Sequence, residues 1–227
     1  MNLTNLILNT DSYKLSHYLQ YPPETHAISS YIEARGHSDR AEVLFFGLQM
    51  FLKEYLSRPV TMQDIDEAEG IVTAHGLPFN REGWTHIVQR HGGYLPLLIE
   101  ALPEGTLVRR GVPVAQVVNT DPACFWLTSY IETALLRAIW YPSTVASNSR
   151  KVKQVIQPIL EKTCDDPAAV LPFRLHDFGA RGTTSFEQAG IGGAAHLVNF
   201  MGTDTVTAAT TARTWPASRS RRPSIPR

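Results

Sequence analysis

The stretch that decides the fold is PFRLHDFGARGTTSFEQAGIGGAAHLVNFMGTDTV, residues 172–206. It begins with a run rich in strand formers that ends at Phe178 and continues into a glycine-containing loop, GARGTTS. A helix is expected from Ser185 to Asn199, and MGTDTV then starts a second strand. A strand, a loop, a helix and a strand at this spacing form a βαβ unit, so these residues predict the beginning of a parallel α/β domain.

Side chains that can bind ligands gather where the first of these strands ends. Phe178 closes the strand, Arg181 stands in the loop that follows, and three hydroxyl residues, 183–185, precede the helix. Ligands of parallel α/β domains bind at the carboxyl ends of strands, and a guanidinium beside helix N-terminal amides suits phosphate or pyrophosphate. An ordinary glycine-containing turn with a solvated Arg181 fits the pattern equally well.

Two further candidates each have a binding and a structural interpretation. Asp204 follows the second strand at the same edge, where its carboxylate could accept hydrogen bonds from a ligand or hold a hydrated metal. Asp204 as the N-cap of a following helix is at least as common. Tyr13 could stack on a flat ring, but capping by Asp11 with an exposed Tyr13 is the simpler interpretation. The glycines of residues 190–193 lie inside the predicted helix and favour a small-residue packing face.

Upstream of residue 169 the pattern is that of an α+β region. A strand is predicted over residues 25–35 and an antiparallel meander over residues 95–118. Helices are predicted over residues 44–56, 61–76, 80–92, 121–139 and 143–161, the last one bent or stopped near Pro158. The fold class is therefore α/β, with an N-terminal α+β domain over residues 1–168, the start of the parallel domain over 169–206, and a basic tail over 207–227.

The charges of the chain are distributed unevenly. Lys plus Arg and Asp plus Glu both number 21, but residues 207–227 hold five arginines and no acid, which leaves a net charge of −5 on residues 1–206. With 43% hydrophobic residues, the 227-residue chain does not belong to the disordered class. The tail has no aromatic interleaving beyond Trp215, so no nucleic-acid partner is expected.

Cysteine, histidine and hydropathy patterns exclude other classes. Cys124 and Cys164 form no CxxC pair, and the eight histidines show no HxxxH or HExxH spacing, so neither a disulfide scaffold nor a metal cluster is expected. No apolar run approaches the length of a membrane span, and the N-terminus lacks the pattern of a signal peptide. We therefore expect a cytoplasmic protein without membrane contact.

Many longer motifs, taken together, resemble nicotinamide phosphoribosyltransferases. They occur in order over about residues 6–206 and include TDSYKLSHYLQYPP, SYIEARG, FFGLQMFL, LPEGTLVRRGVP, VNTDPACFWLTSYIET, WYPSTVASNSR and HDFGARGTTSFEQAGIGGAAHLVNFMGTDTV. The resemblance implies a type II phosphoribosyltransferase fold, in which the second domain is an irregular α/β barrel. It also implies transfer of phosphoribosyl from 5-phosphoribosyl pyrophosphate to nicotinamide, a salvage step toward NAD, with Mg²⁺ and with ATP as a further candidate cofactor.

The resemblance further implies a homodimer with active sites at the subunit interface. Phe178 and Tyr13 of the partner subunit would sandwich the pyridine ring. Arg181 would bind phosphate or pyrophosphate, and Arg35, in YIEARG, would reach across the dimer toward phosphates. Asp204 would accept the carboxamide N–H of nicotinamide and repel the carboxylate of nicotinate. Asp204 and Arg181 are therefore the expected catalytic residues, acting on an oxocarbenium-like transition state.

Members of that family are longer, and the likeness is expected to end at Val206. Residues 214–226, TWPASRSRRPSIP, can be encoded by DNA that in a shifted frame reads Gly-Phe-Ser-Ile-Pro-Ala-Ala-Glu-His-Ser, a segment like the family's. We therefore expect a frameshift between about Val206 and Thr214, and a truncated chain that is inactive because most barrel strands are missing. The alternatives are a nicotinate phosphoribosyltransferase and a non-catalytic fragment that binds nicotinamide or dimerises.

Overall fold

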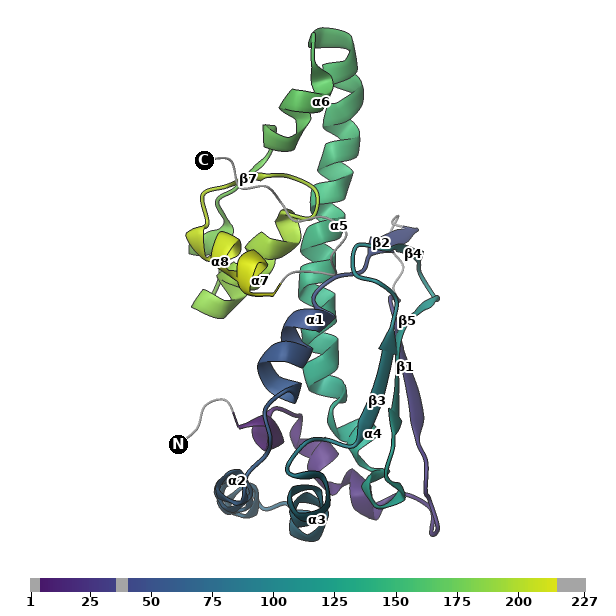
Figure 1. The fold of residues 1–227 in the computed structure, drawn as a ribbon. Coiled ribbons are helices and arrows are strands. Elements are labelled where there is room, and N and C mark those ends of the chain that lie inside the picture. Colours follow the sequence, from purple (N-terminus) through teal and green to yellow (C-terminus); the bar gives the residue numbers. More distant parts are fainter. Residues whose placement is uncertain (1–4, 36–40, 216–227) are drawn as a thin grey trace. The chain divides into compact units, whose positions relative to one another are not determined.

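The computed structural model describes residues 5–35 and 41–215 of the chain. The chain divides into two compact units that interleave along the sequence, and both mix helices with strands (Figure 1). Unit 1 comprises Met1–Glu33, Phe51–Ala101 and Pro113–Arg137, and unit 2 comprises Ala34–Met50, Leu102–Val112 and Ala138–Arg227. The predicted α/β class is confirmed, and the predicted domain boundaries after residues 168 and 206 stay predictions.

A three-stranded antiparallel sheet forms in the described part of unit 1, in the order β1–β5–β3. Its strands are β1 (Ser29–Glu33), β5 (Pro113–Asn119) and β3 (Leu97–Ala101). Val117 of the central strand pairs with Ser30 on one side and with Ile99 on the other. The strands predicted over residues 25–35 and at both ends of residues 95–118 are therefore confirmed.

The predicted meander is wrong in its middle strand. β4 (Leu107–Arg109) does not join this sheet but pairs antiparallel with β2 (Glu42–Leu44) in unit 2. The turn before β4 sets this pairing, because Gly105, at φ 88°, donates its N–H to the carbonyl of Phe45 at 2.8 Å. The N–H of Phe45 in turn donates to the carbonyl of Thr106 at 3.0 Å. Local periodicity carries no sign of a partner so far away in sequence.

Helix boundaries in unit 1 follow capping signals. α2 (Met62–Ala74) begins after Thr61, whose hydroxyl accepts from the N–H of Asp64 at 3.2 Å, while the Asp64 carboxylate accepts from the N–H of Thr61 at 2.9 Å. This reciprocal pair satisfies two backbone donors that the first turn leaves unpaired. α3 (Arg81–His91) begins after Asn80, whose side chain caps it. Both helices are confirmed where the sequence predicted them.

A cluster of aromatic rings lies in the buried core of unit 1. Trp84 of α3 packs edge-on against Trp126 and Tyr130, with ring centroids 5.0 and 5.2 Å apart. Tyr130 is the last residue of α4 (Leu127–Tyr130), and its hydroxyl donates to the carbonyl of Ile7 at 2.6 Å. This bond satisfies the phenol within the core and ties the N-terminal segment to it.

The longest helix in the described part of the chain is α5 (Glu132–Thr163). The sequence predicted two helices here, the second bent or stopped near Pro158. The division into two helices and the stop are wrong, because α5 continues through both Pro142 and Pro158, and the bend stays a prediction. Next to Pro142, the hydroxyl of Ser143 accepts from the N–H of Phe46 and donates to its carbonyl, both at 3.0 Å. Such bonds and packing offset the backbone hydrogen bond that a proline removes from a helix.

The helix predicted over residues 44–56 is shorter than expected. It begins only after Gly47, as α1 (Leu48–Phe51), and continues into a π-helical turn, Leu52–Leu56. Gly47 has a φ of 110°, and a β-carbon there would lie 2.2 Å from Cγ of Pro142. Only glycine fits this close approach, which separates α1 from β2.

Unit 2 contains the βαβ unit that the sequence predicted. Its elements are β6 (His176–Asp177), α7 (Phe186–His196), β7 (Gly202–Thr203) and α8 (Val206–Thr214), of which α7, β7 and α8 are labelled in Figure 1. β6 and β7 pair in parallel, as expected. The first strand begins later than predicted because α6 (Pro167–Val170) and a 3₁₀ turn, Leu171–Phe173, occupy the preceding residues.

Glycines of α7 pack closely against α8, as the small-residue interpretation predicted. A β-carbon at Gly193 would lie 2.3 Å from Cβ of Ala208, and one at Gly190 would lie 2.4 Å from Oγ1 of Thr211. α8 includes the first residues of the predicted basic tail, and residues 216–227 of that tail lie outside the described residues.

The buried core of unit 2 includes Leu44, Phe46, Met50, Ala146, Ala194 and Ala195. Within residues 5–35 and 41–215, no helix combines the length and the apolar character needed to cross a membrane.

Candidate functional site

One backbone hydrogen bond joins the two predicted binding segments of unit 2. The N–H of Asp204 donates to the carbonyl of Asp177 at 2.9 Å, directly beyond the paired residues of β6 and β7. Phe178, which follows Asp177, and Asp204 therefore leave the sheet at the same carboxyl edge. This is the edge at which α/β domains bind ligands. We call Phe178, Arg181 and Asp204 the strand-end group.

The aromatic ring and the cation of this group lie on one ordered turn. The Phe178 side chain is 60% exposed, so a flat ligand can reach its ring without displacing core residues. Arg181, also exposed, lies on the following 3₁₀ turn, Gly179–Gly182. The carboxylate of Asp177 holds this turn, accepting from the N–H of Gly179 at 2.8 Å and from the Thr203 hydroxyl at 3.3 Å.

The N-terminus of α7 is capped by side chains of the chain itself. Ser185 Oγ accepts from the N–H of Gln188 at 3.1 Å, and Gln188 Oε1 accepts from the N–H and the hydroxyl of Thr184 at 2.9 and 2.8 Å. The hydroxyl of Thr183 donates to a carbonyl of the preceding turn. These donors of the predicted anion site therefore already have partners within the chain. Arg181 remains as a group at this edge that can bind a phosphate by charge.

Asp204 does not cap the following helix. The N-cap residue of α8 is Thr205, so the structural interpretation of Asp204 is wrong. The Asp204 side chain is half-exposed, and its Oδ2 lies 3.5 Å from Nδ1 of His176. A half-exposed carboxylate in this position can accept a hydrogen bond from a ligand amide.

A buried histidine holds β7 from the end of α7. His196 accepts at Nδ1 from the Ser149 hydroxyl at 3.0 Å and donates from Nε2 to the carbonyl of Gly202 at 3.1 Å. Its ring also stacks on Phe200, with centroids 5.3 Å apart. Burial lowers the pKa of His196, so the folded chain favours the neutral ring.

Tyr13 lies in unit 1, on the 3₁₀ helix Ser12–Leu19. Lys14 is buried and forms an ion pair with the first residue of α5, whereas the side chain of Tyr13 is exposed. The Asp11 carboxylate accepts from the hydroxyl of Thr133 at 2.5 Å and makes no cap hydrogen bond to the helix. The exposure of Tyr13 is confirmed, and capping by Asp11 is wrong.

The predicted site residues thus divide between the two units. Tyr13 belongs to unit 1, whereas Arg35 and the strand-end group belong to unit 2. Arg35 is exposed and directly precedes residues 36–40, which lie outside the described residues. The structure brings together Phe178, Arg181 and Asp204, and the roles of all five residues stay predictions.

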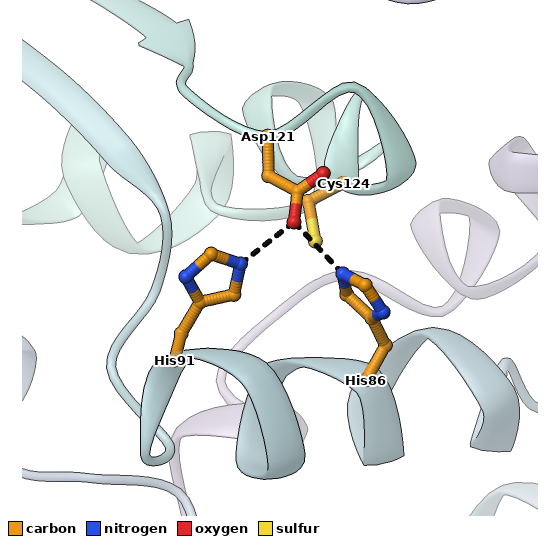
Figure 2. Close-up of side chains that lie close together, drawn as sticks. All are labelled: His86, His91, Asp121 and Cys124. Carbon is orange, nitrogen blue, oxygen red and sulfur yellow. Dashed lines mark hydrogen bonds and ion pairs between the residues drawn. The ribbon is translucent and has the colours of Figure 1, made fainter.

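Four side chains that carry metal-ligand atoms meet in unit 1, and the sequence did not predict this cluster (Figure 2). They are His86, His91, Asp121 and Cys124, with one ligand atom from each lying within 4.8 Å of the others. The histidine spacing rule failed because the two histidines lie five residues apart and their partners follow 30 or more residues later. The cluster is therefore a product of the packing of α3 against the segment after β5.

The pKa values of the two acidic members of this cluster are shifted in opposite directions, by hydrogen bonding in one and by burial in the other. Hydrogen bonds from His86 and His91 hold the pKa of Asp121 well below its usual range. Burial raises the pKa of the Cys124 thiol to about 12. In the structure as it stands, Asp121 is therefore a carboxylate and Cys124 a neutral thiol.

Two sequence families match different parts of the chain. Residues 5–99 match the family described as Nicotinamide phosphoribosyltransferase, N-terminal domain, and residues 173–221 match the Nicotinate phosphoribosyltransferase (NAPRTase) family. The second match includes the strand-end group and continues beyond Val206, so the prediction that the likeness ends at that residue is wrong. The frameshift itself stays a prediction.

The chain is also similar to curated proteins over most of its own length. The nicotinamide phosphoribosyltransferase of Xanthomonas campestris pv. campestris is 54% identical over 211 residues, which cover 93% of this chain and 45% of that protein. The one from Acinetobacter baylyi is 35% identical over 213 residues, which cover 87% of this chain and 42% of that protein. The chain therefore spans about half the length of the curated relatives it matches.

The crystal structure of human nicotinic acid phosphoribosyltransferase has the same fold over 94% of this chain and 39% of its own, with a TM-score of 0.64 at 22% identity. At this identity the structural likeness shows the fold, and the sequence matches show which proteins the chain resembles. The chain is a nicotinamide phosphoribosyltransferase-like protein of mixed α/β fold.

Proposed function

We propose that this chain takes part in the transfer of a phosphoribosyl group from 5-phosphoribosyl pyrophosphate to nicotinamide. The observation that carries the proposal is the hydrogen bond from Asp204 to Asp177, which sets the strand-end group at one edge of the β6–β7 pair. That group offers a ring face, a cation and a hydrogen-bond acceptor, which match the pyridine ring, the phosphates and the carboxamide. The relatives that carry this activity in their names support the same reaction.

In the proposed step, the pyridine nitrogen bonds to C1 of the ribose as the bond from C1 to a pyrophosphate oxygen breaks. The products are nicotinamide mononucleotide and pyrophosphate, and no proton is exchanged at the reacting atoms. Positive charge develops at C1 and negative charge on the leaving group. Arg181 would stabilise the leaving pyrophosphate, and Arg35 of the partner subunit would supply a second cation.

The nicotinamide ring would stack on Phe178, and Tyr13 of the partner subunit would cover its other face. The exposure of both rings supports this role, since each offers a face for stacking. The proposal requires a homodimer with active sites at the subunit interface, and it places the protein in the cytoplasm.

Asp204 would select nicotinamide over nicotinate. Its carboxylate can accept a hydrogen bond from the carboxamide N–H₂, and a hydrogen bond to a charged group contributes about 1.5–3 kcal/mol. Nicotinate would place a second carboxylate in the same position, where like charges repel and no donor is available. Discrimination thus follows from one side chain.

Mg²⁺ enters this proposal with the co-substrate. Proteins usually bind Mg²⁺ through one or two carboxylates together with substrate phosphates. The Asp177 carboxylate already accepts from Gly179 and Thr203, and Asp204 is assigned to the carboxamide, so the described residues at this edge do not form a protein site for the ion. We therefore assign Mg²⁺ to the pyrophosphate and derive no step through it, and ATP is left without an assigned residue.

Calorimetry on the 227-residue chain tests the proposal. Nicotinamide and 5-phosphoribosyl pyrophosphate with Mg²⁺ are titrated separately, and the mixture is then assayed for nicotinamide mononucleotide. Saturable binding of both is expected. Ring binding without pyrophosphate binding would favour the non-catalytic fragment, and binding of neither would contradict the proposal. Turnover would overturn only the prediction that this chain is inactive.

A nicotinate phosphoribosyltransferase is the second candidate. The family match over residues 173–221 favours it, because this match covers the strand-end group. The carboxylate of Asp204 disfavours it, for the electrostatic reason given above. The relative affinity for the two ring substrates separates the candidates.

A further inference from the structure

The side chains of the His86 cluster (His86, His91, Asp121 and Cys124) come from two segments of unit 1. Figure 2 shows both histidines extending from α3 toward the segment that carries Asp121 and Cys124. Their Nε2 atoms lie 2.8 and 2.7 Å from the same carboxylate oxygen, Oδ2 of Asp121. The Cys124 side chain is buried beside this oxygen, and each histidine side chain is about one-third exposed.

Backbone contacts hold the carboxylate in this orientation. Oδ1 of Asp121 accepts from the N–H of Ala123 at 2.9 Å, so Oδ2 is the oxygen directed at the histidines. The carbonyl of Asp121 accepts from the N–H of Cys124 and from the side-chain amide of Asn119, both at 2.9 Å. Asp121 and Cys124 are thus fixed relative to each other by the 3₁₀ turn Pro122–Cys124. A binding site built on such a turn needs little ordering when its ligand arrives.

We propose that His86, His91, Asp121 and Cys124 bind one divalent transition-metal ion, and that Zn²⁺ is the ion these donors fit best. Two imidazole nitrogens, a carboxylate oxygen and a thiolate are a four-ligand set of the kind Zn²⁺ takes in tetrahedral sites. Mg²⁺ and Ca²⁺ take oxygen ligands, so the two histidines and the cysteine disfavour them. The carboxylate and the thiolate together neutralise the charge of the ion.

Binding requires a small rearrangement and the loss of one proton. Metal–ligand bonds of about 2.0–2.3 Å place tetrahedral ligand atoms roughly 3.3–3.8 Å apart, so the two N···O contacts must open by about 0.5–1 Å. Each ring moves its proton from Nε2 to Nδ1 through solvent, which the exposure of the rings permits. Asp121 is already ionised, and the Cys124 thiol releases its proton to solvent, so one proton leaves for each ion bound.

A purely structural cluster is the competing interpretation, because Asp121 accepts from both histidines without any ion. Zn²⁺ titration of the EDTA-treated, dialysed full chain separates the two. The metal site predicts saturable binding of one Zn²⁺ per chain and no comparable binding of Mg²⁺. Co²⁺ should give the visible absorption of a tetrahedral complex together with a thiolate charge-transfer band.

Matched variants locate the ion. His86→Gln and His91→Gln keep a donor toward Asp121, and each should weaken Zn²⁺ binding by at least about 10-fold, since even indirect changes around a metal cost that much. His75→Gln, an exposed histidine of the same unit, should leave the affinity unchanged. Cys124→Ala should abolish the Co²⁺ charge-transfer band, and Cys164→Ala should not.

The results divide cleanly between the two interpretations. The absence of saturable Zn²⁺ binding would overturn the proposal, as would affinity that survives both histidine variants or a charge-transfer band that depends on Cys164. If Cys124→Ala fails to fold, the two histidine variants and His75→Gln decide alone, because they leave the buried thiol in place.

Discussion

At the carboxyl edge of β6 and β7, single residues supply the proposed chemistry. Phe178 offers an exposed ring, Arg181 a cation, and Asp204 a half-exposed acceptor. Other residues hold the backbone that carries them. Asp177 holds the turn of residues 179–182, and His196 holds β7 through the carbonyl of Gly202. The proposed substrate contacts and the residues that support them can therefore be separated by mutation.

Phe178→Ala should weaken nicotinamide binding by about 10-fold, because an aromatic pair contributes about 0.5–1.5 kcal/mol beyond the area it buries. Isothermal titration calorimetry with nicotinamide measures the change. Phe186→Ala is the control, since Phe186 is even more exposed but lies at the start of α7. Equal losses in the two variants would contradict a specific stack on Phe178.

His196 should make the stability of unit 2 depend on pH. Burial lowers its pKa in the folded chain. The charge of Asp177 partly opposes this shift by raising the pKa, and His176 lowers the pKa further. The neutral His196 ring therefore contributes its full stabilisation above the unfolded pKa of about 6.5. As the pH falls below that value, the free energy of unfolding decreases by at most about 1.4 kcal/mol per pH unit.

Urea unfolding of the wild type and His196→Gln at pH values on both sides of 6.5 measures this effect. The variant should be less stable by about 1–3 kcal/mol at neutral pH, because buried hydrogen bonds are lost. The difference should shrink as the pH falls. A difference that stays constant with pH would contradict the role of His196, and His75→Gln controls for the loss of an exposed histidine.

At the scale of elements, local sequence signals were sufficient to predict a helix boundary wherever a cap or a glycine sets it. The capping box of Thr61, the cap of α3 and the start of α7 at Ser185 were all visible in the sequence. Pairing over long sequence distances was not visible. β4 joins β2 through Gly105, and α5 continues through Pro142 because segments distant in sequence pack there.

Alanine substitution should have opposite effects at two helical glycines, one in the close contact between α7 and α8 and one in open space on α2. Gly193→Ala should destabilise unit 2 by about 1–3 kcal/mol, because its β-carbon would lie 2.3 Å from Cβ of Ala208 and overpack the contact. Gly70→Ala in α2, with nothing within 4 Å, should stabilise the chain by about 0.5–1 kcal/mol. Chemical denaturation compares the two, and equal effects would contradict the packing argument.

At the scale of the whole molecule, two interleaved units share the functions inferred here. The sequence predicted the edge of unit 2 because βαβ patterning is local, and the resemblance supplied roles for Phe178, Arg181 and Asp204. The sequence did not predict the His86 cluster, because that site forms only when α3 packs against the segment after β5. The chain spans about half the length of the curated relatives it matches, and their activity stays a proposal for it.

The ratio of nicotinamide to nicotinate affinity, in the wild type and in Asp204→Asn, tests the central claim most directly. The wild type should prefer nicotinamide by about 10-fold or more, in line with a hydrogen bond to a charged group. Asp204→Asn should abolish that preference, whereas Asp165→Asn, which removes an exposed carboxylate of the same unit, should retain it. Equal binding of the two rings by the wild type, or an unchanged preference in Asp204→Asn, would contradict the account.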